Sequence, residues 1–242
     1  MLIINKKKIL FVICATILSF AFYGYNTNNE GINKDIVNTK LVNTIPVTNK
    51  SIIIDAGHGF PDGGAVGNSG TIESEVNLKI ALKLQKLLEE SGSTVILTRS
   101  DENGIYDNDS DSISKKKVSD IQNRVELGNN SSADIFISIH LNKIEQEEYN
   151  GWQTFYNEKS KDGERLSESI QKSLNETISK NNTRQPKSID NVYILKHVEI
   201  PTSIVECGFL SNKEEEEKLK SEEYQNQLAY GIYLGIIDYF YK

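Results

Sequence analysis

The 242-residue sequence contains little cysteine and has no cysteine-based metal pattern. Its only cysteines are Cys14 and Cys207, and Cys14 falls within an apolar N-terminal run. We therefore do not expect the two to pair, and the sequence excludes a disulfide framework. Because no C-x-x-C motif is present either, a transition metal in this protein would have to be held by histidine and carboxylate side chains.

Basic residues are fewer than acidic ones: the chain has 27 lysines and arginines and 34 aspartates and glutamates. The formal net charge is −7 at pH 7, and the three lysines of residues 6–8 lie near the N-terminus, so the rest of the chain is more acidic still. Proteins whose main partner is nucleic acid need a basic footprint, which this chain lacks. Neutral or peptide-bearing substrates remain open. The charged fraction of 25% and the hydrophobic fraction of 38% are typical of a folded protein.

The N-terminus has the pattern of a targeting segment. Residues 1–25 combine three lysines with an apolar, uncharged run, as secretory signals do. Aromatic residues stand where a cleavage site needs small ones, so the segment is either a removed signal peptide or an uncleaved membrane anchor. The Asn-rich residues 26–49 are expected to form a flexible linker, and residues 50–242 a folded domain. Both interpretations of the leader place that domain outside the cytoplasm.

From residue 50 onward, strand-like and helix-like runs alternate. Strands separated by helices of this length predict βαβ units, and hence an α/β fold: a three-layer α/β/α sandwich with a mostly parallel sheet. The polar stretch 100–117 is expected to be a surface loop, since it lacks the spacing of an EF-hand calcium loop. The expected strands are 51–55, 94–98, 134–140, 153–156, 192–195 and 203–207, and the expected helices are 72–90, 118–129, 163–180, 213–220 and 222–239.

Two of the three histidines come at the ends of apolar strands. His58 follows the run Ile52–Ile54, and His140 ends the run IFISIH. Open α/β sheets bind their ligands beyond the carboxyl ends of the strands. Glu73, in the first turn of the next helix, can face the same point. Two imidazole nitrogens and one carboxylate, with a fourth position left to water, form a catalytic zinc arrangement. His197 is expected to be a surface imidazole.

Glu206 lies in a strand that otherwise consists of apolar and small residues, SIVECG. An acid there is costly to bury unless it is paired, coordinates a metal or carries protons. In zinc hydrolysis a nearby carboxylate takes a proton from the attacking water and returns it to the leaving group, which is the role we assign to Glu206. The alternative is a salt bridge. Asp55 either steadies a ligand imidazole or caps its loop, and Arg184 either lines the substrate groove or is a solvated loop cation.

Several motifs resemble those of the zinc-dependent N-acetylmuramoyl-L-alanine amidases. They span the chain from about residue 51 to its C-terminus, and they include Asp55-Ala56-Gly57-His58-Gly59, Glu73-x-Glu75-Val76-Asn77-Leu78, Phe136-Ile137-Ser138-Ile139-His140 and Val205-Glu206-x-Gly208-Phe209-Leu210-Ser211-Asn212. The resemblance implies that His58, Glu73 and His140 bind Zn²⁺ and that Glu206 is catalytic. The implied reaction is hydrolysis of the amide between the lactyl group of N-acetylmuramic acid and L-alanine in peptidoglycan, by an amidase domain over residues 50–242.

Two further stretches, 149–156 and 195–201, more narrowly resemble the germination-specific, spore-cortex branch of this family. Its members remove the peptide from muramic acid so that muramic-δ-lactam can form. This implies an extracytoplasmic enzyme, with the forespore intermembrane space as one expected compartment and an accessory lipoprotein as one expected partner. Division amidases that hold themselves inactive carry a long helical insertion after the second ligand histidine. Only a short, Glu-rich turn follows His140 here, so we expect an open cleft.

Two other functions stay open at this point. One is a non-catalytic wall-binding protein that keeps zinc for structure, and the other is a zinc peptidase or deacetylase that uses the same site on another bond. The first is disfavoured by Glu206, because a structural zinc takes four protein ligands. The chain also departs from the family pattern at Phe60 and Gly63, where glycine and proline are usual. Both departures bear on the shape of a loop more than on zinc binding.

Overall fold

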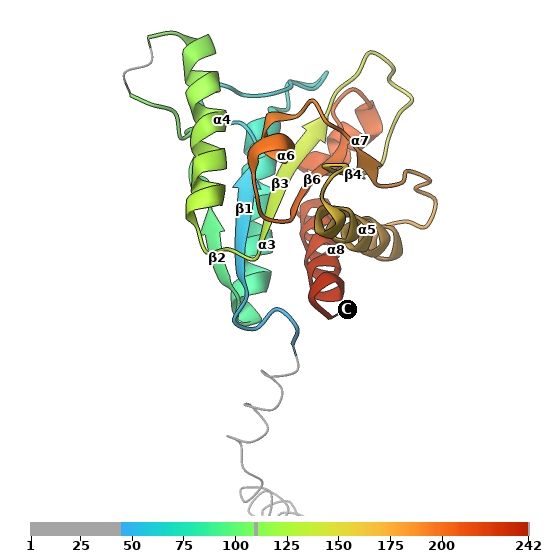
Figure 1. Cartoon of the computed structure of the whole chain (residues 1–242). Coiled ribbons are helices and arrows are strands. Elements are labelled where there is room, and N and C mark those ends of the chain that lie inside the picture. The colour runs from blue at the N-terminus through green and yellow to red at the C-terminus, as the bar shows by residue number, and fades with distance from the viewer. Residues whose placement is uncertain (1–44, 109–110, 242) are drawn as a thin grey trace, which may run out of the picture. The chain divides into compact units, whose positions relative to one another are not determined.

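The computed structural model describes residues 45–108 and 111–241 (Figure 1). The predicted leader, residues 1–25, and the predicted linker up to residue 44 lie outside the described residues. The last part of the predicted linker is packed: Val47 has no exposed surface, and its carbonyl accepts a hydrogen bond from the Ser93 hydroxyl at 2.8 Å. Among the described helices, none is both long and apolar enough to cross a membrane.

A six-stranded sheet in the order β2-β1-β3-β6-β4-β5 forms the middle of the domain. The first four strands in that order are parallel, whereas β4 pairs antiparallel with β6, and β5 runs parallel to β4. The predicted mostly parallel sheet is confirmed, with one reversal near its edge. The strand bounds are β1 (Ser51–Ala56), β2 (Thr94–Leu97), β3 (Ile135–Asn142), β4 (Gln153–Tyr156), β5 (Lys187–Ser188) and β6 (Thr202–Phe209).

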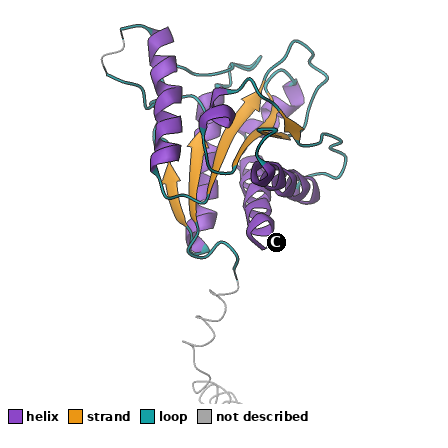
Figure 2. Ribbon diagram, in the orientation of Figure 1, coloured by secondary structure: helices purple, strands orange, loops and turns teal. Residues whose placement is uncertain are grey.

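Helices cover both faces of the sheet, so the predicted three-layer sandwich is also confirmed (Figure 2). Successive residues of a strand point to opposite faces. In β1, Ile52 and Ile54 accordingly pack with Leu84 of α3, whereas Ile53 packs on the other side with Val125 of α4. The first face carries α3 (Glu73–Glu90), α5 (Lys161–Thr177) and α8 (Glu222–Tyr241), the second carries α4 (Ile113–Asn130) and α6 (Tyr193–His197), and α7 (Lys213–Lys220) follows β6.

Two predicted elements are wrong. The expected strand 192–195 is wrong, because residues 193–195 begin the short helix α6. Ile194 in that helix and Val198, which follows it directly, are four residues apart and belong to the same core cluster. A short apolar run fits a buried strand and a buried helix turn equally well, which explains the error. The expected loop 100–117 ends early, because α4 begins at Ile113 and the Ser112 hydroxyl caps it by accepting a hydrogen bond from the Lys115 N–H.

Candidate metal centre

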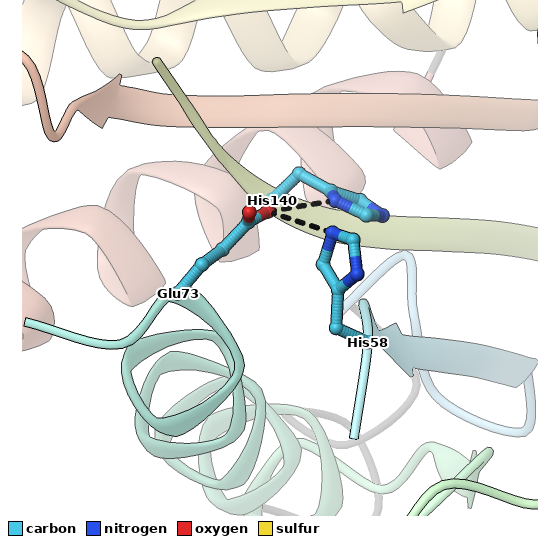
Figure 3. Close-up of side chains that lie close together, drawn as sticks. All are labelled: His58, Glu73 and His140. Carbon is cyan, nitrogen blue, oxygen red and sulfur yellow. Dashed lines mark hydrogen bonds and ion pairs between the residues drawn. The ribbon is translucent and has the colours of Figure 1, made fainter. Parts of the chain in front are cut away.

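The structure brings His58, Glu73 and His140 together at the carboxyl end of the parallel strands (Figure 3). His58 follows β1, His140 lies on the neighbouring β3, and Glu73 opens α3. Glu73 Oε1 lies 3.3 Å from His58 Nε2 and 3.0 Å from His140 Nδ1. One potential ligand atom from each residue lies within 4.8 Å of the others. The expected donors therefore converge on one point.

The backbone around these residues is shaped to make room for them. His58 adopts a left-handed φ of 62°, which is uncommon for a residue other than glycine and marks functional sites when the surroundings enforce it. A Cβ on Gly57 would lie 2.3 Å from His140 Nε2, and a Cβ on Gly64 would lie 2.6 Å from Glu73 Oε2. Both positions therefore need glycine if the ligand side chains are to keep their places.

Asp62 orients the His58 ring. Its Oδ2 lies 2.9 Å from His58 Nδ1, and its Oδ1 accepts hydrogen bonds from Lys117 Nζ at 2.7 Å and the Gly64 N–H at 3.1 Å. This pairing leaves Nε2 of His58 to face Glu73. A histidine that binds a metal almost always donates its other ring N–H to such an acceptor. This role of Asp62 was not predicted from the sequence, although its position four residues after His58 was the available signal.

Charges near the site shift the pKa values of its members. Burial on its own would lower the pKa of His58, but the hydrogen bonds and charges of Asp62 and Glu73 outweigh it and raise that pKa to about 9. For Glu73, burial would raise the pKa, yet the hydrogen bonds from His140 and His58 hold it well below its usual range. Glu73 is thus ionised, and a metal ion that binds His58 must displace a proton from its ring.

Glu73 is also held by the backbone on two sides. Its Oε2 accepts the Ala65 N–H at 2.8 Å, and its Oε1 accepts the Leu141 N–H at 3.1 Å. Glu75, two residues further along α3, is exposed and takes no part in the site. The carboxylate that can bind an ion is therefore fixed between the loop before α3 and the end of β3.

Asp55 does not contact an imidazole. It is fully buried, and its carboxylate accepts hydrogen bonds from Arg124 of α4, Ser138 and Thr98. Arg124 is itself only 2% exposed and donates to the His58 carbonyl at 2.6 Å. The Asp55–Arg124 pair therefore holds the loop that carries His58, which agrees with the second of the two roles considered for Asp55.

Glu206 lies beside the three donors. In the sheet it is paired with His140 of β3 on one side and with Gln153 of β4 on the other. Its Oε2 is buried without a hydrogen-bond partner. Burial, with a smaller contribution from the charge of Glu73, raises the pKa of Glu206 to about 7, although His140 and His58 oppose the shift. Within the described part of the chain Glu206 forms no ion pair, so the salt-bridge alternative finds no support.

The donor set fits a zinc ion. Zinc binds imidazole nitrogen and carboxylate oxygen, and three protein ligands with an open position are typical of its catalytic sites. Calcium and magnesium prefer sites made of oxygen ligands alone. Among the described histidine, cysteine, aspartate and glutamate residues, His58, Glu73 and His140 form the group whose ligand atoms lie close enough together to share one ion. His197 is exposed and stacks on Tyr193 with ring centres 4.0 Å apart, away from this role.

Comparisons with known proteins point to one family. A family model described as N-acetylmuramoyl-L-alanine amidase matches residues 52–238. The chain is 38% identical over 197 residues to the germination-specific N-acetylmuramoyl-L-alanine amidase of Bacillus subtilis, an alignment that covers 81% of this chain and 82% of that protein. It is also similar to the solved structure of the CwlD amidase from Clostridioides difficile in complex with the GerS lipoprotein, with 44% identity, a TM-score of 0.77 and coverage of 79% and 98% of the two chains.

A second curated relative extends the comparison to a longer protein. The chain is 33% identical over 212 residues to the N-acetylmuramoyl-L-alanine amidase LytC of Bacillus subtilis, of which the match covers 39%. A structure of an N-acetylmuramoyl-L-alanine amidase from Clostridium difficile 630 matches with 32% identity and a TM-score of 0.68, over 79% of this chain and 97% of that one. The match to LytC covers 86% of this chain.

Proposed function

This chain belongs to the N-acetylmuramoyl-L-alanine amidase family and acts on peptidoglycan, and we propose that it does so by a zinc-dependent hydrolysis at the candidate metal centre. The bond cleaved is the amide between the lactyl group of N-acetylmuramic acid and L-alanine. His58, Glu73 and His140 hold the ion, and Glu206 is the general base and acid. The observation that carries the proposal is the position of Glu206, which adjoins His140 in the sheet and keeps one carboxylate oxygen free of protein partners.

The chain's own residues carry the proton transfers. When bound, zinc supplies a Lewis acid that polarises the amide carbonyl and makes water nucleophilic near neutral pH. Glu206 accepts a proton from the attacking water. It then donates that proton to the departing amine of L-alanine. A carboxyl group whose pKa is near 7 is suited to both steps, because at neutral pH it can accept or donate a proton at little cost in free energy.

The spore-cortex role rests on the relatives. The Bacillus subtilis protein is named a germination-specific amidase, and the Clostridioides difficile structure holds an amidase with a lipoprotein. On that basis this chain removes stem peptides from cortex muramic acid so that muramic-δ-lactam forms, and an accessory lipoprotein is its partner. The protein works outside the cytoplasm, either secreted or anchored by residues 1–25, with the forespore intermembrane space as its compartment.

The experiment that tests this function follows the bond that is broken. Purified protein with zinc is incubated with peptidoglycan, and newly freed amino groups of L-alanine are measured. Their appearance is the expected result. Free acetate would indicate a deacetylase, an amino group of another residue would indicate a peptidase, and peptidoglycan that binds without any cleavage would indicate a wall-binding protein.

A further inference from the structure

Arg184 lies on the loop between α5 and β5 and is fixed in place by aromatic rings and neutral groups. Its guanidinium carbon lies 4.5 Å from the ring centre of Phe209 and 5.4 Å from that of Tyr149. Its Nε donates to the Asn150 carbonyl at 3.0 Å, and its Nη1 donates to Gln153 Oε1 at 3.3 Å. Stacking on aromatic faces restrains a guanidinium without neutralising it. Arg184 is thus a preoriented cation.

Among the described residues, Arg184 has no carboxylate within ion-pair distance. In the ranges that the structure describes, the arginine ion pairs belong to Arg124 and Arg165. Glu215 is within range of the Arg184 charge, but its two oxygens accept the backbone N–H groups of Gly151 and Phe209, each at 2.7 Å. A guanidinium carries five N–H donors, and two are used, so the remaining donors are available to a ligand.

The sheet connects Arg184 to the catalytic glutamate through one intervening residue, Gln153. His140, Glu206 and Gln153 are paired residues on adjacent strands, so their side chains line one face of the sheet in that order. Arg184 holds the amide of Gln153, the last of the three. Neighbouring strands lie ~4.8 Å apart, so the guanidinium lies on the order of 10 Å beyond Glu206 along this line. The metal donors are on one side of Glu206, and Arg184 is on the other.

The direction of the reaction assigns the peptide to the Arg184 side. Glu206 protonates the departing amine in the proposed function, so the leaving group faces Glu206, and the leaving group is the stem peptide. An extended peptide advances about 3.3–3.6 Å per residue, and its second or third residue therefore reaches the guanidinium. Stem peptides carry free carboxylates there: the α-carboxylate of a γ-linked second residue, and that of a diamino acid at the third. The exposed Lys187, opposite Phe155 in the sheet, adds positive charge to the same face.

We infer that Arg184 binds a carboxylate of the stem peptide and so selects muramic acid that bears an acidic peptide. Guanidinium and carboxylate can form a bidentate pair of charge-assisted hydrogen bonds, and Arg184 has N–H donors left for such a pair. This inference rests on the proposed function for the direction of the peptide. It extends that function by naming the group that recognises the part of the substrate beyond the cleaved bond.

Binding is the direct test, and it can be measured without turnover. Calorimetry is done on the full chain with Glu206→Gln and zinc, with a muramoyl tripeptide as the probe and two further probes amidated at the second or at the third residue. Arg184→Gln weakens binding of the free acid about 10- to 100-fold. Amidation of the contacted carboxylate weakens binding to the unaltered Arg184 by a similar factor, and the two losses do not add. The probe that loses affinity identifies the carboxylate.

The matched control is Arg165→Gln. Arg165 also stacks on an aromatic ring, that of Tyr239 at 3.9 Å, and donates to a backbone carbonyl. It is expected to leave the affinity for all three probes unchanged. Unfolding temperatures show whether either variant loses its fold. Arg184→Lys keeps the positive charge but not the forked guanidinium, so its affinity for the free acid is expected to lie between that of the unaltered protein and that of Arg184→Gln.

Equal losses for Arg184→Gln on the free and amidated probes, or no loss on amidation of either residue, would overturn the inference. Release of L-alanine by the protein with Glu206 intact is measured in parallel. If that release is absent while binding still depends on Arg184 and one carboxylate, the proposed function fails and the carboxylate site stands.

Discussion

Asp62 offers a quantitative test of how the candidate centre is held together. The change is Asp62→Ala, which removes the acceptor 2.9 Å from His58 Nδ1 and leaves the Nε2 that faces Glu73 untouched. Loss of such a partner typically costs 10- to 100-fold in metal affinity. Since tenfold corresponds to ~1.4 kcal/mol, the expected loss in zinc binding free energy is about 1.4–2.8 kcal/mol.

The assay is competition for zinc with a coloured chelator at pH 8, and it needs a control for the rest of the Asp62 network. Lys117→Gln removes the ion pair with Asp62 Oδ1 at 2.7 Å without touching the imidazole. Because Lys117 is half exposed, that pair contributes at most ~1 kcal/mol to stability, and zinc affinity should change little. If Asp62→Ala binds zinc as tightly as the unaltered protein, or no more weakly than Lys117→Gln does, Asp62 does not orient the ligand.

Three further predictions concern Glu206 and Gly57, which packs against the His140 ring. As the general base, Glu206 must be ionised, so kcat/KM should fall as pH drops below about 7, and a flat profile from pH 5 to 8 would contradict the role. The pKa of Glu206 is raised in the folded protein, so its ionised form lowers stability once the pH exceeds the pKa of the unfolded chain. Glu206→Gln should therefore raise the unfolding temperature of the zinc-free protein at pH 8 but not at pH 4. If the variant and the unaltered protein unfold at the same temperature at pH 8, Glu206 does not carry a buried charge. Gly57→Ala should lower zinc affinity at least tenfold, because the new Cβ falls 2.3 Å from His140 Nε2, and unchanged affinity would show that the ring is free to move.

Much of the fold follows from short-range patterns. The apolar run Ile52–Ile54 and the helical spacing of the following residues are enough to place β1 and α3, and the same logic places β3 and β6. It fails at Ile194 and Leu195, where two buried residues fit a strand and a helix turn equally well. The two-residue strand β5 has no pattern of its own, because it is defined only by its pairing with β4.

Some residues of the candidate site could likewise be predicted from the sequence, and others could not. His58 and His140 could be predicted to meet because parallel strands end at one edge of a sheet, and Glu73 because its helix begins there. Asp62 could not be assigned, since a glycine-rich loop has no periodicity that fixes where a side chain points. Arg184 is linked to Glu206 through Gln153, which lies opposite Glu206 in the antiparallel pairing of β4 with β6. Strand direction is a property of the packed sheet, and the sequence of Gln153–Tyr156 does not reveal it.

The proposed roles of the three donors and of Glu206 are tested together by comparing the Glu206→Gln variant with the unaltered protein. Two quantities are measured: zinc content by mass spectrometry, and release of L-alanine amino groups from peptidoglycan. We expect the variant to retain one zinc ion per chain, since Glu206 is not among the three converging donors. We expect its release of L-alanine to fall at least 100-fold. Full release by the variant would show that Glu206 is not the general base, and loss of its zinc would show that Glu206 helps to hold the ion.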